Sequence, residues 1–378
     1  MIAVAQLFGT SLWFSINGVW LSMSQELGLR NADLGYLTVT VQAGFIVGTL
    51  LLGLTGFADR VRASHIFAVA SLCGAMVNAG FLLLGPQPYF DWLLRFLTGL
   101  CLAAIYPLGM KLVISWGPQH AGAALSWLVG MLTVGTALPH LMRGATLNLP
   151  WEWTLLGASL LALVGGLLIL TLGDGPHLPG TGDRPSVRHG LSALQLPGFR
   201  AVAGGYFGHC WELYAFWMLV PLLVGREISR LEVSVEWVPW FSFAVIAGGF
   251  VGCVWGGRLV QKLGSEWVAR HALAASGALC LAYPLLAWVP PGVLLLMLGL
   301  WGMAVIADSP QFAALAAANA PRETVGSSLA LMNGIGFALT IPPIWLTSLL
   351  WDPQGTWVIL WLLPGPLLGL WAMKGLRK

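Results

Sequence analysis

Two acidic residues, Glu212 and Asp308, stand inside long stretches of the chain that are otherwise apolar. His209 precedes Glu212 by three residues, so one turn of a helix would place the imidazole and the carboxyl group on the same face. A buried acid and a neighbouring imidazole can exchange a proton, and this spacing predicts a proton-carrying pair. Two alternatives stay open: a neutral hydrogen-bonded pair with a structural role, and a soft-metal site around Cys210, which finds no second His or Cys at the next turn.

Asp308 is followed by Pro310, and Gln311 lies about one turn further along. Proline inside a membrane helix removes a backbone donor, frees a carbonyl group and bends the helix. An acid beside such a bend can bind a proton or a cation, so we expect Asp308 to take part in coupling and Gln311 to lie near it. His140, which follows Pro139 in another apolar stretch, is a further candidate for the same role.

A third charged residue, Arg95, also lies inside an apolar stretch, with Thr98 and Gly99 on its helix face. A charged side chain at the centre of a membrane helix costs roughly 2.5–3.5 kcal/mol, so such residues normally face a cavity, pair with another charge or have a function. We expect Arg95 to be the counter-charge of the two acids. The alternative is a structural arginine whose donors bind backbone carbonyl groups.

The composition identifies the class of protein in which these residues act. Of the 378 residues, 57% are hydrophobic and only 9% are charged. Soluble proteins have about 25% charged residues, and disordered chains combine low hydrophobicity with high charge. A soluble enzyme, a nucleic-acid binder and a disordered protein are therefore excluded, and a polytopic membrane protein remains. The five cysteines show no paired spacing, so neither a disulfide framework nor a zinc site is indicated.

Apolar stretches of about 20 residues are long enough to cross the ~30 Å hydrocarbon core as helices. We expect twelve of them: 3–23, 34–57, 64–84, 90–115, 119–142, 151–172, 199–223, 235–258, 267–288, 292–318, 325–349 and 355–373. A Gly- and Pro-rich segment at 173–198 divides them six and six and predicts a flexible cytoplasmic linker. The expected fold is an all-α polytopic membrane protein with an N-terminal six-helix bundle over 1–172 and a C-terminal six-helix bundle over 199–378.

The basic residues indicate the orientation of these spans. If the N-terminus is cytoplasmic, thirteen Lys and Arg residues fall in cytoplasmic segments and four fall on the other side: Arg30, Arg143, Arg226 and Arg230. This distribution follows the positive-inside rule and predicts that both termini are cytoplasmic. Together with the compact loops, it favours the cytoplasmic (inner) membrane of a prokaryote.

Two loops at corresponding places in the halves have related sequences. Asp59 in the loop after the second span and Gln261 in the loop after the eighth take matching positions. With these loops the chain resembles the major facilitator superfamily of secondary transporters, whose loop motif is G-x-L-a-D-R-x-G-R-K. The first copy keeps Ala58, Asp59 and Arg60 and has Arg62 at a Gly position; the second keeps Gly257, Leu259 and Gly264 and has Lys262 for Arg. A family motif of the fourth span, R-x-x-x-G-x-G-x-A, is similar to the segment from Arg95 to Ala103, with Cys101 at one Gly position.

This resemblance implies a fold and a function. The fold would be two pseudo-symmetric halves of six helices, and the function secondary active transport of a small organic solute by alternating access. By the same resemblance, the two loops form a conformational latch made by Asp59, Arg60, Arg62, Gly257, Lys262 and Gly264. The arginine of the fourth-span motif, here Arg95, would take part in proton coupling or in the response to substrate.

Polar and aromatic residues inside the spans are candidates for lining the transport pathway. We expect this group to be Trp13, Asn17, Gln42, Trp217, Gln311 and Asn333. For amides, a hydrogen bond to a neighbouring helix is the commoner use, and most of the twenty tryptophans lie near span ends, where indole rings prefer the headgroup region. A pathway with aromatic rings, amides and few charges predicts a small organic solute of modest polarity.

Several other functions have sequence signatures that can be looked for. The chain has no G-x-x-x-x-G-K-[ST] and no H-E-x-x-H, so neither ATP binding through a P-loop nor a membrane zinc protease is indicated. We expect no cofactor, no metal and no nucleic acid; the expected partners are the substrate, protons and the lipid bilayer, with the protein a monomer. A passive facilitator or a drug or metabolite efflux pump of the same fold stays open, although the fifth span lacks the Gly-Pro of the family's antiporter motif. A non-transporting membrane enzyme or receptor would need a clustered nucleophile and base, and the sequence indicates none.

Overall fold

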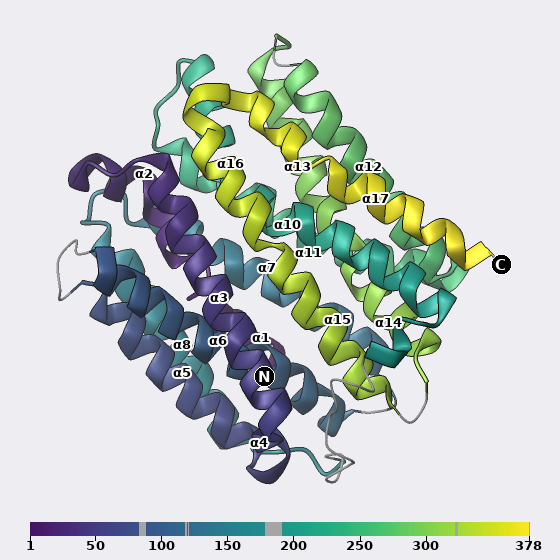
Figure 1. The fold of residues 1–378 in the computed structure, drawn as a ribbon. Coiled ribbons are helices and arrows are strands. Elements are labelled where there is room, and N and C mark those ends of the chain that lie inside the picture. Colours follow the sequence, from purple (N-terminus) through teal and green to yellow (C-terminus); the bar gives the residue numbers. More distant parts are fainter. Residues whose placement is uncertain are drawn as a thin grey trace.

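The computed structural model of the protein is a bundle of helices (Figure 1). It describes residues 1–82, 88–117, 119, 121–177, 191–286, 288–321 and 324–377, and no strand occurs among these residues. The helices from the first part of the chain, purple and blue in Figure 1, lie beside those from the second part, green and yellow. Here the "first half" means residues 1–172 and the "second half" residues 197–377.

The first half is made of helices with mostly apolar side chains. A helix makes its backbone hydrogen bonds within itself, as a membrane interior requires. These helices are α1 (Ile2–Thr10), α2 (Ser15–Leu27), α3 (Asn31–Thr55), α4 (Phe57–Arg60), α5 (Ala63–Gly80), α6 (Pro88–Trp116), α7 (Ala121–Ala145) and α8 (Glu152–Leu172). Glycine ends two of them: Gly28 after α2 has φ 66° and Gly56 after α3 has φ 61°. Other residues rarely adopt this left-handed conformation.

The second half is also made of helices, and more of its spans are divided into two helical segments. They are α10 (Pro197–Arg230), α11 (Trp237–Leu263), α12 (Ser265–Leu285), α13 (Pro291–Ala307), α14 (Ser309–Asn319), α15 (Val325–Leu339), α16 (Ile341–Gln354), η3 (Gly355–Trp361), α17 (Pro364–Met373) and η4 (Lys374–Arg377). The helix α10 is 34 residues long and continues through Pro221.

The predicted spans agree with these helices. Each of the twelve coincides with one helix or with two consecutive helical segments. In the described chain, ten helical stretches are long and apolar enough to cross a membrane. One of these stretches, 325–376, contains the last two predicted spans, and α12 coincides with the predicted ninth. The prediction of an all-α polytopic membrane fold is thus confirmed.

Three spans divide near their middle into two α-helices, and the last predicted span divides into the 3₁₀ helix η3 and the helix α17. Residues 11–14 separate α1 from α2, Asp308 separates α13 from α14, and Thr340 separates α15 from α16. The expected bend at Pro310 takes the form of the second break, with Pro310 in the first turn of α14, where the missing N–H is not needed. The break at 11–14 has no proline or glycine and was not expected from the sequence.

The beginning of the predicted linker packs on the first half. The Ser64 N–H donates to Asp174 Oδ1 (2.7 Å), and Asp174 thereby caps the start of α5. The N–H groups of Gly175 and His177 donate to the hydroxyl and the carbonyl of Ser115 (3.1 and 3.0 Å). Residues 178–190 of the predicted linker lie outside the described residues.

The halves pack on each other through α3 with α16 and through α7 with α11. At the end of the bundle where α3 begins, here called the Asn31 end, Asn31 Nδ2 donates to Asp352 Oδ1 (2.7 Å) and joins the halves directly. One turn along α3, Gly35 lies so close to α16 that an added Cβ would be 1.7 Å from Ser348 Oγ. Only glycine permits this approach, which holds α3 and α16 together at the Asn31 end.

Candidate functional site

Each of the three breaks is contacted by a side chain from another span. Arg95 of α6 meets the break between α1 and α2. Gln42 of α3 meets Thr340, and His209 of α10 meets Asp308. Asp308 and Thr340 keep a helical backbone conformation, and their carbonyls accept from Phe312 N–H and Ile344 N–H, so of the three breaks only residues 11–14 leave the regular helix. Binding sites in membrane proteins are commonly built where helices are discontinuous. The breaks therefore locate the candidate site in the interior of the bundle.

In the second half, the site contains a histidine–aspartate pair. His209 Nδ1 lies 2.8 Å from Asp308 Oδ1, and both side chains are almost completely buried. The imidazole lies between the rings of Tyr206 and Phe312, each with its centroid 6.0 Å away. The contact is an ion-pair distance, since His209 Nδ1 and both Asp308 carboxylate oxygens have no hydrogen-bond partner among the described residues. The pair can hold or exchange a proton, and one carboxylate oxygen stays available to another group.

Glu212, one turn along α10, makes a separate cluster. Its Oε1 accepts hydrogen bonds from Ser276 Oγ (2.7 Å) and Trp301 Nε1 (2.8 Å). Its Oε2 has no partner in the described chain, and the residue is fully buried.

From the sequence we predicted that His209 pairs with Glu212, whereas in the structure His209 contacts Asp308 instead. The break between α13 and α14 brings the Asp308 carboxyl group to the imidazole, while Glu212 turns toward α12 and α13. Gln311, expected near the site, is buried on α14, and Asn333 of α15 is half-buried.

In the first half, Arg95 is buried without an acidic partner. Its terminal nitrogens donate to the Trp13 carbonyl (2.5 Å), the Leu12 carbonyl (3.3 Å) and Ser15 Oγ (3.2 Å). No ion pair joins Arg95 to an acid within the part of the chain that the structure describes. The structure therefore shows the contacts of the structural alternative, and the counter-charge role stays a prediction without a contact in this conformation.

Between the halves, a hydrogen-bonded bridge runs through Gln42. Trp13 Nε1 donates to Gln42 Oε1 (2.8 Å), and Gln42 Nε2 donates to Thr340 Oγ1 (3.0 Å). Trp13 and Gln42 belong to the first half and Thr340 to the second. The amide thus joins two broken spans from opposite halves.

Aromatic rings from both halves surround this bridge, and we call them the aromatic cluster: Trp13, Phe14, Phe45, Tyr214, Trp217 and Phe337. Trp13 lies with ring centroids 4.7 Å from Phe45 and 5.4 Å from Tyr214. Trp217 is fully buried, and its Nε1 donor has no partner among the described residues. Both tryptophans chosen from the sequence thus lie at the contact between the halves.

A second group of candidates lies nearer the Asn31 end. His140 and Asn17 line a small cavity of about 20 Å³ together with Pro221 and Ser242 of the second half. The buried atoms His140 Nε2 and Ser242 Oγ have no partner in the described chain. Asn17 Nδ2 donates to Thr38 Oγ1 (3.3 Å), which is the helix-to-helix use of an amide.

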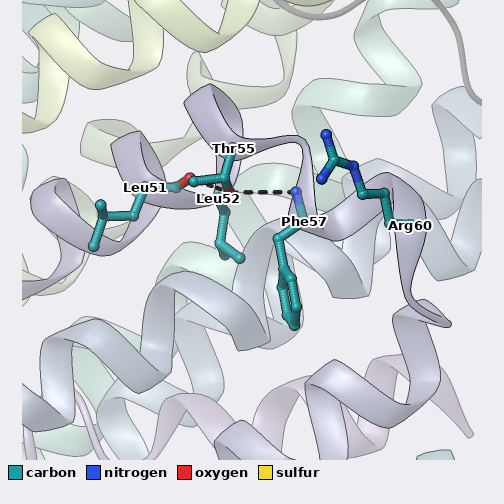
Figure 2. Close-up of a pocket in the computed structure, with 5 residues that line it drawn as sticks. All are labelled: Leu51, Leu52, Thr55, Phe57 and Arg60. Carbon is teal, nitrogen blue, oxygen red and sulfur yellow. Dashed lines mark hydrogen bonds between the residues drawn. The ribbon is translucent and has the colours of Figure 1, made fainter.

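The predicted latch loop follows α3 (Figure 2). Leu51, Leu52, Thr55, Phe57 and Arg60 line an open pocket of about 380 Å³, and all five belong to the first half. The side chain of Asp59 lies outside the described part of the chain.

The other predicted latch residues lie at the surface as the sequence suggested. Arg60 and Arg62 are exposed, as is Lys262 in the second copy of the loop. Gly257 lies within α11, and Gly264 ends that helix with φ 82°. The latch itself stays a prediction.

One buried acid was missed by sequence reasoning. Glu227 is fully buried near the end of α10, beyond the predicted seventh span. It pairs with Arg226 and with Arg230 Nη1 (2.6 Å), and its Oε1 accepts from Tyr283 Oη (2.8 Å). Arginines directly before it and one turn after it are the signal that could have identified it.

Comparisons with known proteins agree with this architecture. The model of the Major Facilitator Superfamily matches residues 2–342. Curated proteins give no match. Solved structures similar in fold include the xylose transporter XylE from E. coli in a partially occluded inward-open conformation (TM-score 0.72, 14% identity, covering 99% of this chain and 95% of that one).

Two further solved structures are similar. One is the nucleoside transporter NupG (TM-score 0.72, 15% identity, covering all of both chains). The other is a bacterial homolog of the human lysosomal transporter Spinster in an inward-facing conformation (TM-score 0.63, 16% identity, covering 100% of this chain and 93% of that one). At these identities the likeness shows the fold alone. With a family model that spans nearly its whole length, the chain belongs to the major facilitator superfamily.

Proposed function

We propose that the protein is a proton-coupled secondary transporter of a small organic solute. One observation carries the proposal: Asp308 and Glu212 are two fully buried acids, and each has a carboxylate oxygen without a hydrogen-bond partner in the described chain. Ionisable groups inside a membrane protein are costly, and they mark proton relays and ion pathways by default. A purely structural acid would be expected to use both oxygens.

His209 supplies the group with which a proton can be exchanged. Its Nδ1 is 2.8 Å from Asp308, so a proton between them changes the charge at the break between α13 and α14. A change of charge at a break alters which of two arrangements of the helix is favoured. Proton binding at Asp308 would thus bias the position of α13 and α14, while the Glu212 cluster ties α10 to α12 and α13.

The aromatic cluster and Gln42 are the proposed solute site. They lie between the halves, where alternating access requires the solute to bind, and the cluster contains no charged residue. The unpartnered Trp217 Nε1 offers a donor to an acceptor group on the solute. These groups fit an uncharged or weakly polar organic molecule.

The membrane location is part of the same proposal. Thirteen basic residues in the segments assigned to the cytoplasm, against four on the other side, support an inner membrane protein with both termini in the cytoplasm. We further propose that a monomer carries out transport, because the pathway lies between the two halves of one chain.

The test begins with a thermal-shift screen of the purified protein against solutes at two pH values, since a ligand that binds the folded state raises its apparent stability. A solute found in this way is then offered to proteoliposomes with and without a proton gradient, with a pH-sensitive dye inside. We expect the wild type to concentrate the solute and to move protons with it.

Asp308→Asn and Glu212→Gln variants are expected to equilibrate the solute without concentrating it. Glu236→Gln, the same change at an exposed acid, is the matched control and should behave as the wild type. Full accumulation by both buried-acid variants at every pH would overturn the proposal. Uptake that equilibrates in the wild type, with no proton flux, would identify a passive facilitator instead.

A further inference from the structure

We infer that Arg95 is a positioning residue: it holds the break between α1 and α2 in the shape that lets Trp13 bind Gln42, and through Gln42 it sets the contact between the two halves. The inference rests on the proposed solute site but not on proton coupling. It assigns Arg95 a role through Trp13 rather than as a carrier of charge.

The break leaves backbone carbonyl groups that need donors. In the described chain, no backbone N–H donates to the carbonyl of Leu12 or of Trp13, because the regular hydrogen bonds resume only with Gly18 N–H to Phe14. An unpartnered carbonyl inside a membrane protein costs several kcal/mol. Arg95 donates to both carbonyls, and Ser15 Oγ also donates to the Leu12 carbonyl (3.1 Å). The Trp13 carbonyl therefore depends on the guanidinium as its donor in the described chain.

A set of neutral side chains fixes Arg95 and its neighbours from the other side. Arg95 also donates to Ser15 Oγ (3.2 Å), and Ser15 in turn donates to Asn78 Oδ1 (2.7 Å). Asn78 Nδ2 donates to Ser159 Oγ (3.0 Å), which connects the break to α5 and α8. The guanidinium keeps its proton in proteins and binds with a rigid fork of donors. These are the properties of a fixed support.

Trp13 is bound by Arg95 through its backbone carbonyl, and its side chain is connected to the second half through Gln42. The Trp13 carbonyl accepts from Arg95 (2.5 Å), and the Trp13 indole donates to Gln42 (2.8 Å). Gln42 then donates to Thr340, which lies at the break between α15 and α16. A change in the backbone at residue 13 therefore moves the indole away from Gln42 and alters the bridge between the halves.

The experiment uses the Trp13 indole as its probe and needs no substrate. The full-length protein is labelled with ¹⁵N-tryptophan in detergent, and the Nε1–H resonance of Trp13 is assigned with a Trp13→Phe variant. In Arg95→Met we expect this resonance to shift to the position it has in Gln42→Met, and the indole hydrogen to exchange at least about tenfold faster, since it has lost its acceptor; a tenfold change corresponds to about 1.4 kcal/mol. Arg95→Lys should give an intermediate result, because an ammonium group does not reproduce the fork.

Arg143→Met is the matched control. Arg143 also donates to two backbone carbonyls, those of Thr146 and Leu149, and lies away from Trp13 on α7. We expect it to leave the Trp13 resonance and exchange rate unchanged. The Arg95→Met and Gln42→Met changes should not add, because both break one bridge.

A Trp13 resonance and exchange rate unaffected by Arg95→Met, or equally affected by Arg143→Met, would overturn the inference. If Arg95→Met does not fold, the comparison of Arg95→Lys with Gln42→Met decides in the same way. A transporter without proton coupling would refute the proposed function and leave this result standing.

Discussion

The two halves treat buried charge in opposite ways. In the first half, one cation, Arg95, is surrounded by carbonyl and hydroxyl oxygens, and both of its terminal nitrogens have partners. In the second half, two acids each keep an oxygen without a partner in the described chain, and one of them lies against His209. Arg95 Nε is the one donor of that side chain without a partner in the described chain. A group whose terminal donors are bound by fixed acceptors can support structure, whereas a carboxylate with a free oxygen can change its protonation state. Under the proposed function, the first half would supply support and the second half titration.

The largest expected effect comes from breaking the pair in the second half. His209→Phe leaves Asp308 buried without a partner, and removing one member of a buried pair costs about 3–5 kcal/mol. We expect a loss of about 3 kcal/mol in the free energy of unfolding, measured by SDS titration, together with loss of accumulation. Adding Asp308→Asn to His209→Phe should restore most of the stability and none of the accumulation. If His209→Phe is as stable as the wild type, the pair is not what holds this half.

The second largest expected effect tests the structural role of Arg95 in the first half. Arg95→Met leaves the Trp13 carbonyl unpartnered, at a cost of about 1–3 kcal/mol, whereas the Leu12 carbonyl keeps the Ser15 hydroxyl as a donor. We expect the free energy of unfolding to fall by about 2 kcal/mol, with the ratio of protons to solute unchanged in proteoliposomes. A variant of normal stability whose proton-to-solute ratio has changed would reverse the assignment of the two halves.

Glu227→Gln tests whether the role of a buried charged group depends on its having partners or on the half in which it lies. Glu227 is a buried acid of the second half, but both of its oxygens have partners. The paired arginines are partly exposed, so we expect a loss of only about 1–2 kcal/mol, with coupling intact. Stability by SDS titration and dye-reported proton flux measure the two quantities. Loss of proton flux would place Glu227 with the titrating acids.

The smallest effect concerns the contact between the halves at the Asn31 end. Asn31→Leu removes the hydrogen bond to Asp352, an exposed bond worth about 0.5–1.5 kcal/mol. We expect the population open at this end to grow about twofold to tenfold. Nitroxide labels at Leu149 and Trp288, both exposed, would report this as a larger fraction of long distances in pulsed EPR. An unchanged distance distribution would show that Gly35 and Ser348 hold this end alone.

The spans and the break at Asp308 could be predicted from the sequence, because the length of an apolar stretch and the position of a proline are local features of the chain. It did not reveal the break at residues 11–14, because Ser11-Leu12-Trp13-Phe14 has no helix breaker and Arg95 comes from another span. The buried polar candidates were found, since charged and amide residues are rare inside apolar stretches. Their partners were not, because the contacts from His209 to Asp308 and from Gln42 to Thr340 depend on how helices pack.

The unbroken helix α10 joins these regions mechanically. At 1.5 Å per residue its 34 residues extend for about 51 Å, well beyond the ~30 Å hydrocarbon core. One continuous helix therefore carries the proposed proton site at His209, the proposed solute site at Tyr214 and Trp217, and the ion pairs of Glu227. Under the proposed function, with this end of α10 held by the Glu227 ion pairs, a tilt of the helix started by a proton at His209 would move the aromatic rings without a relay of side chains. The binding of proton and solute would then be coupled by the movement of the single helix α10.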